Sequence, residues 1–89
     1  MGVSDKDSCL GRVKVHEIKK GSIVLKIYKK NFRNRIYFDY RVDRMFISGD
    51  GAESYTPFCQ QPDLRDTVRA AMDAQEWIAL QHRNIRDGN

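Results

Sequence analysis

Basic and aromatic side chains, which can meet phosphates and stack on nucleobases, are concentrated between residues 11 and 44 of this 89-residue chain. That stretch holds eleven Lys and Arg against three acids, a net charge of +8, whereas residues 1–10 carry −1 and residues 45–89 carry −3. The net charge of +4 is therefore distributed unevenly along the chain. Such polarisation predicts one positive surface, which would attract phosphate backbones, anionic lipids or acidic proteins.

The strands that must position these side chains are predicted from alternating apolar and polar residues. They are expected at residues 12–18, 23–30, 35–42 and, interrupted by Pro57, 52–59. Turns are expected at 19–22 and 31–34, and residues 44–48 either prolong the third strand or start a turn. The alternation of the first strand is broken at Ile18, which predicts a bulge or a bend near Glu17.

One amphipathic helix is expected after Pro62, with Asp63 as its N-cap and Asp66 as the reciprocal carboxylate of a capping box. A helical wheel predicts that one apolar stripe packs on the sheet. That stripe consists of Leu64, Val68, Ala71, Gln75 and Ile78. Trp77 projects away from its centre, so its ring suits either the rim of the core or a second interface.

These elements predict an α+β fold, a four-stranded antiparallel sheet followed by one C-terminal helix packed on one face. The length allows one domain, expected over residues 11–82. The polar segments 1–10 and 83–89 are expected to be flexible ends.

A lone helix leaves one face of the sheet open, and alternation decides which residues occupy it. The face expected to meet the helix holds Val13, Val15, Ile23, Leu25, Ile27, Ile36, Phe38 and Tyr40. The opposite face is then expected to hold Lys14, His16, Lys26, Tyr28, Lys30, Arg35, Tyr37 and Arg41. Lys29 and Arg33 would extend this basic surface at the hairpin. Because tyrosine rings stack on bases while Lys and Arg meet phosphates, the sequence predicts non-enzymatic binding of single-stranded DNA or RNA.

Two other interpretations fit the same residues. A basic face that bears tyrosines can be plain solvated surface, because such residues favour strands and protect sheet edges. It can also dock an acidic protein partner in a small adaptor domain, in which a patch around Trp77 is the other candidate interface.

Catalytic, metal and cofactor sites are not expected. His16 and His82 are the only histidines and form no HxxxH or HxH pattern, and a zinc site that added Cys9 and Cys59 would lack closely spaced ligand pairs. Two distant cysteines without an export signal indicate reduced thiols and a cytoplasmic protein. No apolar run approaches the roughly 20 residues of a membrane helix, so no membrane partner is expected.

Short motifs between residues 18 and 78 resemble a family of small bacterial proteins to which no activity is attached. The residues that carry this resemblance are Gly21–Asn31, Arg35–Phe38, Arg44, Phe58, Asp63-Leu64 and Ala74–Ile78. Members of that family tend to have Trp where Tyr28 stands and another Trp near Tyr55. The order of strands and helix is also similar, at the level of fold alone, to single-stranded-DNA-binding transcriptional regulators of the Whirly and PUR-alpha types, and that resemblance implies a homodimer.

Overall fold

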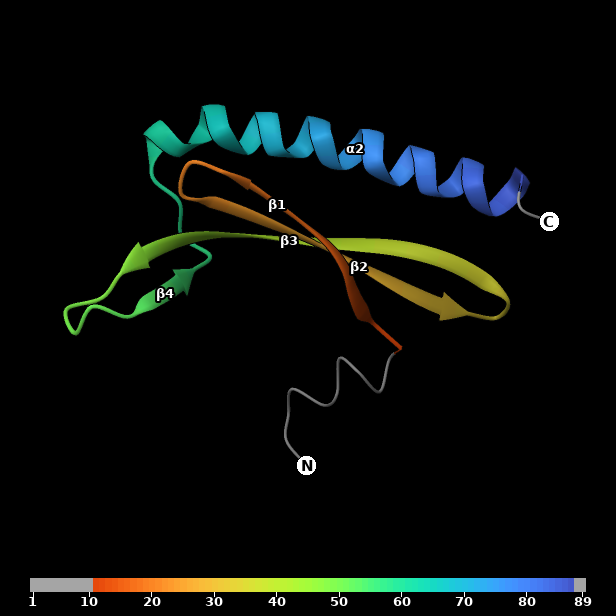
Figure 1. Cartoon of the computed structure of the whole chain (residues 1–89), viewed down its shortest axis with the longest axis horizontal. Coiled ribbons are helices and arrows are strands. Elements are labelled where there is room, and N and C mark those ends of the chain that lie inside the picture. The colour runs from red at the N-terminus through yellow and green to blue at the C-terminus, as the bar shows by residue number, and fades with distance from the viewer. Residues whose placement is uncertain (1–10, 88–89) are drawn as a thin grey trace.

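A computed structural model describes residues 11–87 of the chain. Strands β1 (Val13–Lys20), β2 (Ile23–Phe32), β3 (Arg35–Ile47) and β4 (Glu53–Thr56) form one antiparallel sheet in the order β1-β2-β3-β4. A 3-10 turn, η1 (Gln61–Asp63), leads into the long helix α2 (Leu64–Asp87), which lies along one side of the sheet (Figure 1). The predicted α+β class, with four antiparallel strands and one C-terminal helix, is confirmed.

The expected ends of the domain are covered only in part by the described residues. The N-terminal segment 1–10 and residues 88–89 lie outside them. Helix α2 continues through Asp87, past the expected boundary at residue 82. Residues 83–87 therefore belong to the last turns of the helix.

Two tight hairpin turns connect the first three strands. Gly21 and Ser22 join β1 to β2, and Gly21 has a φ of +58°, which glycine adopts without steric cost. Arg33 and Asn34 join β2 to β3 with φ values of 52° and 63°, as a type I′ turn requires at both central positions. Because this second turn uses only two residues, β2 continues to Phe32 instead of ending at residue 30 as predicted.

The β-bulge in β1 lies at Val15, two residues before the predicted position at Glu17. Lys14 pairs with Tyr28 and His16 with Ile27, so Val15 is the extra residue of a β-bulge. The bulge turns His16 toward the helix side of the sheet and leaves Val13 and Val15 exposed. The prediction that His16 shares the open face is therefore wrong. Val13, opposite Lys29, lies on the predicted helix side of the sheet but is mostly exposed, and Val15 is the unpaired bulge residue, so neither valine packs against the helix.

The core lies between α2 and the first two strands. Ile18, Ile23, Leu25 and Ile27 pack against Ala70 and Ala74, and Phe38, Val42, Trp77 and Ile78 complete the cluster at its rim. Ala70 and Ala74 are small enough to let the helix approach the isoleucines of β2 closely. The Trp77 ring is half-buried and stacks on His16, with ring centroids 4.6 Å apart and planes 2° from parallel.

The helix is rotated relative to the prediction. Leu64 and Val68, at the start of the apolar stripe expected to pack on the sheet, are mostly exposed. Instead Ala70, Ala74 and Trp77 face the strands, because this rotation buries the largest aromatic ring of the helix against His16 and Phe38. Trp77 thus occupies the core-rim position that was one of its two expected roles.

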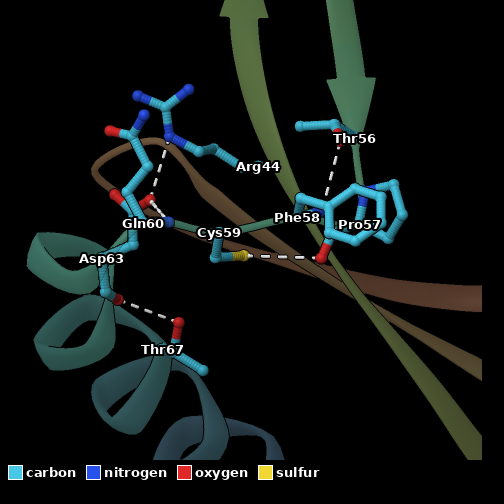
Figure 2. Close-up of polar contacts among 8 residues, drawn as sticks. All are labelled: Arg44, Thr56, Pro57, Phe58, Cys59, Gln60, Asp63 and Thr67. Carbon is cyan, nitrogen blue, oxygen red and sulfur yellow. Dashed lines mark hydrogen bonds and ion pairs between the residues drawn. The ribbon is translucent and has the colours of Figure 1, made fainter.

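The connection from β4 to α2 is fixed by one carboxylate (Figure 2). Asp63 Oδ2 accepts hydrogen bonds from Gln60 N–H at 2.8 Å and from Arg44 Nε at 2.9 Å, and the second of these ties β3 to the start of the helix. Asp63 is therefore not the N-cap that the sequence suggested. Gln60 holds that place, and Asp63 is the reciprocal carboxylate three residues later, because a 3-10 turn precedes the helix.

The structure also decides two predictions about the ends of the third and fourth strands. Residues 44–47 prolong β3 rather than starting a turn. Strand β4 ends at Thr56, before Pro57, which has no N–H to donate to a ladder.

Candidate nucleic-acid interface

The strand register decides which side chains share the sheet face opposite α2. Antiparallel partners that lie directly opposite each other point to the same side. Lys26 pairs with Arg41, Lys30 with Tyr37, and Lys14 with Tyr28. We call this surface the open face. Its members from the predicted set are Lys14, Lys26, Tyr28, Lys30, Arg35, Tyr37 and Arg41.

Two residues of the predicted set lie elsewhere. Lys29 pairs with Phe38, which packs on Trp77, so Lys29 belongs to the helix side of the sheet. Arg33 sits in the β2–β3 turn, with its guanidinium carbon 5.1 Å from the centre of the Phe32 ring. The turn therefore contributes a cation at the end of the open face, and Lys29 does not contribute to that face.

Sequence reasoning missed two aromatic rings of the open face. Phe32 pairs with Arg35 on this face and is 54% exposed, but the expected turn at 31–34 had removed it from the strand. A two-residue turn at Arg33-Asn34 would have predicted its position. Tyr55 reaches the face through pairing of β4 with β3, opposite Met45, and no spacing in the sequence predicts that pairing.

Three of the rings form a diagonal series along the β2–β3 hairpin. Tyr28 pairs with Asp39, Tyr37 with Lys30, and Phe32 with Arg35, so each ring is the diagonal neighbour of the next across the two strands. Diagonal neighbours in an antiparallel pair lie about 7–8 Å apart, within reach of aromatic side chains. Tyr37, in the middle of the series, is 41% exposed. We call Tyr28, Tyr37 and Phe32 the aromatic series.

Acidic residues reduce the positive charge at the β1 end of the open face. Glu17 accepts a hydrogen bond from Lys14 at 2.9 Å and forms an ion pair with Lys19 at 3.7 Å. The hydrogen bond with Lys14 lowers the pKa of the Glu17 carboxyl below its ordinary value and, with the charge attraction between the two groups, raises the pKa of the Lys14 amine. Both groups are therefore charged at neutral pH, and Lys14 is already occupied by an acid.

Two further ion pairs cross the same surface. Arg41 Nε lies 2.8 Å from Asp43 Oδ2, and Arg12 Nε lies 2.9 Å from Asp39 Oδ2. Asp43 is only 2% exposed, and its Oδ1 atom has no hydrogen-bond partner in the described structure. Its strand partner Val24 is also buried, so the face is closed at this end and is accessible mainly toward the β2–β3 turn.

Three cations of the open face form no ion pair within residues 11–87. Lys30 and Arg35 lie beside the β2–β3 turn, and Lys26 lies farther along β2. Lys26 Nζ lies 4.8 Å from the centre of the Tyr55 ring and Lys30 Nζ lies 6.0 Å from that of Tyr37. Because Lys26 is the strand partner of Glu17, Lys30 and Arg35 are the cations that are free to meet anionic groups beside the aromatic rings.

A hollow of about 570 Å³ lies on the accessible part of the open face. It is lined by Arg12, Tyr28, Lys30, Asp39 and Arg41, together with Phe38 and Tyr40 of the β3 strand. Cavities of this size are in the range that holds small ligands. The hollow combines one ring of the aromatic series with three basic side chains.

Other site chemistry is sparse in the described part of the chain. Residues 11–87 contain no group of three or more His, Cys, Asp or Glu placed to hold a metal ion. His16 stacks on Trp77, and His82 packs edge-on against Phe38 at 5.2 Å between ring centroids. Over the same residues, no helix combines the length and the apolar character that crossing a membrane requires.

Comparison of the chain with protein-family models, with curated proteins and with solved structures finds no match in any of the three. The candidate site is therefore argued from its own geometry.

Proposed function

We propose that the open face binds single-stranded nucleic acid, DNA or RNA, without catalysis. The observation that carries the proposal is the aromatic series of Tyr28, Tyr37 and Phe32 beside the unpaired cations Lys30 and Arg35. Successive bases would stack on the rings while the phosphates follow the cations, and stacking contributes about 1–3 kcal/mol per base. The low cysteine content of the sequence favours a cytoplasmic role.

The geometry supports single strands over duplexes. A ring can stack only on a base whose face is exposed, and the bases of a duplex already stack on one another. Tyr28 lies beside β1, whereas Tyr37 and Phe32 lie on the two-stranded end of the β2–β3 hairpin, beyond the last β1 pair of Val13 with Lys29. The preference for single strands therefore rests on the exposed rings.

The cations differ in their expected contribution. Lys30 and Arg35 are the principal phosphate ligands, and Lys26 and Arg33 assist. In the free protein, Lys14 forms an ion pair with Glu17 and Arg41 forms one with Asp43, so a phosphate contact at either cation must replace an existing ion pair. Lys29 has no direct role, because it lies on the helix side of the sheet.

A second candidate function is an adaptor that docks a protein beside Trp77. A groove of about 320 Å³ lies next to this ring, lined by His16, Ile18, Asp73, Glu76 and Leu80. Leu80 is substantially exposed there. Of the two acids that line this groove, Asp73 already forms an ion pair with Lys20 at 2.9 Å, which leaves Glu76 to favour a partner with basic and apolar side chains. An acidic protein would instead compete for the open face.

The experiment that tests the proposal is fluorescence anisotropy of labelled single-stranded DNA and RNA oligomers, with a duplex of the same sequence as control. We expect binding to single strands that weakens steeply between about 50 and 200 mM salt, because phosphate contacts release counterions. A preference for the duplex, or no binding at low salt, would overturn the proposal. Binding to a protein through the Trp77 groove would instead depend little on salt.

A further inference from the structure

An acidic side chain, Asp39, lines the hollow of the open face. Asp39 is the strand partner of Tyr28, and both residues border the same hollow of about 570 Å³. Among residues 11–87, no other acid lines it. A carboxylate repels phosphates, so Asp39 is unsuited to contact the backbone of a nucleic acid. Its two oxygens can instead accept hydrogen bonds from the N–H groups of a base.

The Asp39 carboxylate is held in position and remains accessible. Arg12 Nε lies 2.9 Å from Asp39 Oδ2, and the Asp39 side chain is still 36% exposed. A carboxylate offers about four lone pairs on its two oxygens, so the bond from Arg12 leaves acceptor sites on both oxygens. The Arg12 charge also offsets the carboxylate charge, which lets an acid lie on a face that attracts phosphates. Asp43, the acid paired with Arg41, is only 2% exposed and is closed to a ligand.

The donor pattern of the bases decides which of them fits a carboxylate. Guanine presents two adjacent donors, N1–H and N2–H, on its Watson–Crick edge, and these match the two oxygens of a carboxylate. Adenine and cytosine place their amino group beside a ring nitrogen that is an acceptor, and thymine or uracil places its one N–H between two carbonyl oxygens. An acceptor that faces the carboxylate is repelled by it. Because the Watson–Crick edge is free in a single strand, guanine is the base that fits Asp39 best.

The other two rings of the aromatic series have cations as their direct cross-strand partners. Tyr37 lies opposite Lys30 and Phe32 lies opposite Arg35, whereas Tyr28 lies opposite Asp39. A carboxylate contact with a stacked base is therefore expected at Tyr28 and not at the other two rings.

We infer that the hollow is a guanine subsite of the open face. One guanine of a single strand stacks on Tyr28 and donates N1–H and N2–H to the Asp39 carboxylate, which Arg12 positions. Lys30 follows Tyr28 on this face of β2 and forms no ion pair within residues 11–87, so it meets the phosphate of the same nucleotide. This inference rests on the proposed function, because a base reaches Asp39 only if the single strand binds the open face.

The test compares labelled thymine oligomers of about eight nucleotides in which one central base is guanine, hypoxanthine, adenine, cytosine or thymine. Fluorescence anisotropy at low salt measures the affinity of the full chain for each oligomer. We expect the guanine oligomer to bind at least about fivefold more tightly than the adenine, cytosine and thymine oligomers, because a bidentate contact discriminates by that factor or more. Hypoxanthine lacks the N2 amino group of guanine, so its oligomer should bind with intermediate affinity.

Two variants locate the group that recognises the base. Asp39→Asn replaces one acceptor oxygen by an amino group, so this variant should still bind the oligomers but with similar affinities for guanine, adenine, cytosine and thymine. Glu17→Gln is the matched control, because it removes the same charge from the open face outside the hollow and should keep the guanine preference. Circular dichroism verifies that both variants are folded. If Asp39→Asn is unfolded, the guanine and hypoxanthine oligomers decide, since they change a single donor of the ligand and leave the protein intact.

The results that would overturn the inference differ from those that would overturn the proposed function. Equal affinities of the wild-type chain for all the oligomers would rule out the guanine subsite and leave single-strand binding in place. A guanine preference that Asp39→Asn retains would also rule it out, because another group would then recognise the base. No binding of any oligomer would overturn both the subsite and the proposed function.

Discussion

The cations of the open face differ in whether they already form an ion pair with an acidic side chain. Lys14 and Lys19 share Glu17, whereas Lys30 lies beside the Tyr37 ring and has no acidic partner within residues 11–87. The spacing of the sequence predicted that Lys14 and Lys30 share a face, whereas Lys19 was expected in a turn. It did not predict which are neutralised, because Glu17 reaches that face only through the bulge at Val15.

Replacing Glu17 with Gln should therefore strengthen nucleic-acid binding. The change releases Lys14 and Lys19, and each cation that gains a phosphate contact should increase the salt slope of binding by about one. Anisotropy titrations at several salt concentrations measure both the affinity and the slope. Asp50→Asn is the matched control, since the Asp50 carboxylate also has a lowered pKa but accepts its hydrogen bonds from Ser48 and Ala52 in the β3–β4 loop. Weaker binding by Glu17→Gln would contradict the assignment.

Lowering the pH should strengthen nucleic-acid binding, as Glu17→Gln should. Hydrogen bonding to Lys14 lowers the Glu17 pKa from its ordinary value of 4.5, so the pair persists above the folded pKa and is lost as the pH falls through it. Wild-type affinity should rise in that window below pH 4.5, and Glu17→Gln should remove the rise.

The tyrosines of the aromatic series should matter through their rings and not through their hydroxyls. Changing Tyr28 and Tyr37 together to Ala should remove stacking of about 1–3 kcal/mol per base, a loss of at least about thirtyfold in affinity for single strands. Changing both to Phe should keep most of the affinity. Equal affinities for the Ala and Phe variants, with circular dichroism showing that both are folded, would contradict stacking on these rings.

The strands could be predicted from the sequence, but the position of the β-bulge in β1 could not. Alternation identified the three long strands because the side chains on their core side are apolar. Pro57 indicated that the fourth strand would be interrupted, and β4 does end before it. The position of the bulge was missed, since one extra residue anywhere between Lys14 and Ile18 gives nearly the same apolar pattern.

The helix illustrates why apolarity alone cannot set a rotation. The stripe that begins at Leu64 is more apolar than the one through Ala70 and Ala74, yet the latter faces the sheet. Close approach of the alanines and stacking of Trp77 on His16 decide the rotation, and neither is visible in the period of the sequence.

The β1–β2 turn offers a test of the contact between the sheet and the helix. An added Cβ at Gly21 would clash with the Asp66 carboxylate, and the φ of +58° is unfavourable for alanine. Gly21→Ala should lower the free energy of unfolding by about 1–3 kcal/mol, measured by urea denaturation. Gly49→Ala is the matched control, because an added Cβ there meets nothing within 4 Å, and it should be nearly neutral. Equal effects would contradict the assigned turn geometry.

The molecule as a whole separates a basic sheet from an acidic C-terminal half. Residues 11–44, which form β1, β2 and most of β3, carry +8, whereas residues 45–89, which include β4 and α2, carry −3. Under the proposed function, this uneven charge would steer a single strand toward the sheet.

The most direct test of the central claim compares two adjacent lysines that the strand sends to opposite faces. Lys30 lies on the open face and Lys29 on the helix side, so Lys30→Glu and Lys29→Glu make the same change of charge one residue apart. In anisotropy titrations with a single-stranded oligomer at low salt, we expect Lys30→Glu to weaken binding about tenfold and Lys29→Glu by less than about threefold. Equal losses in the two variants, or a wild-type chain that does not bind the oligomer, would contradict binding through the open face.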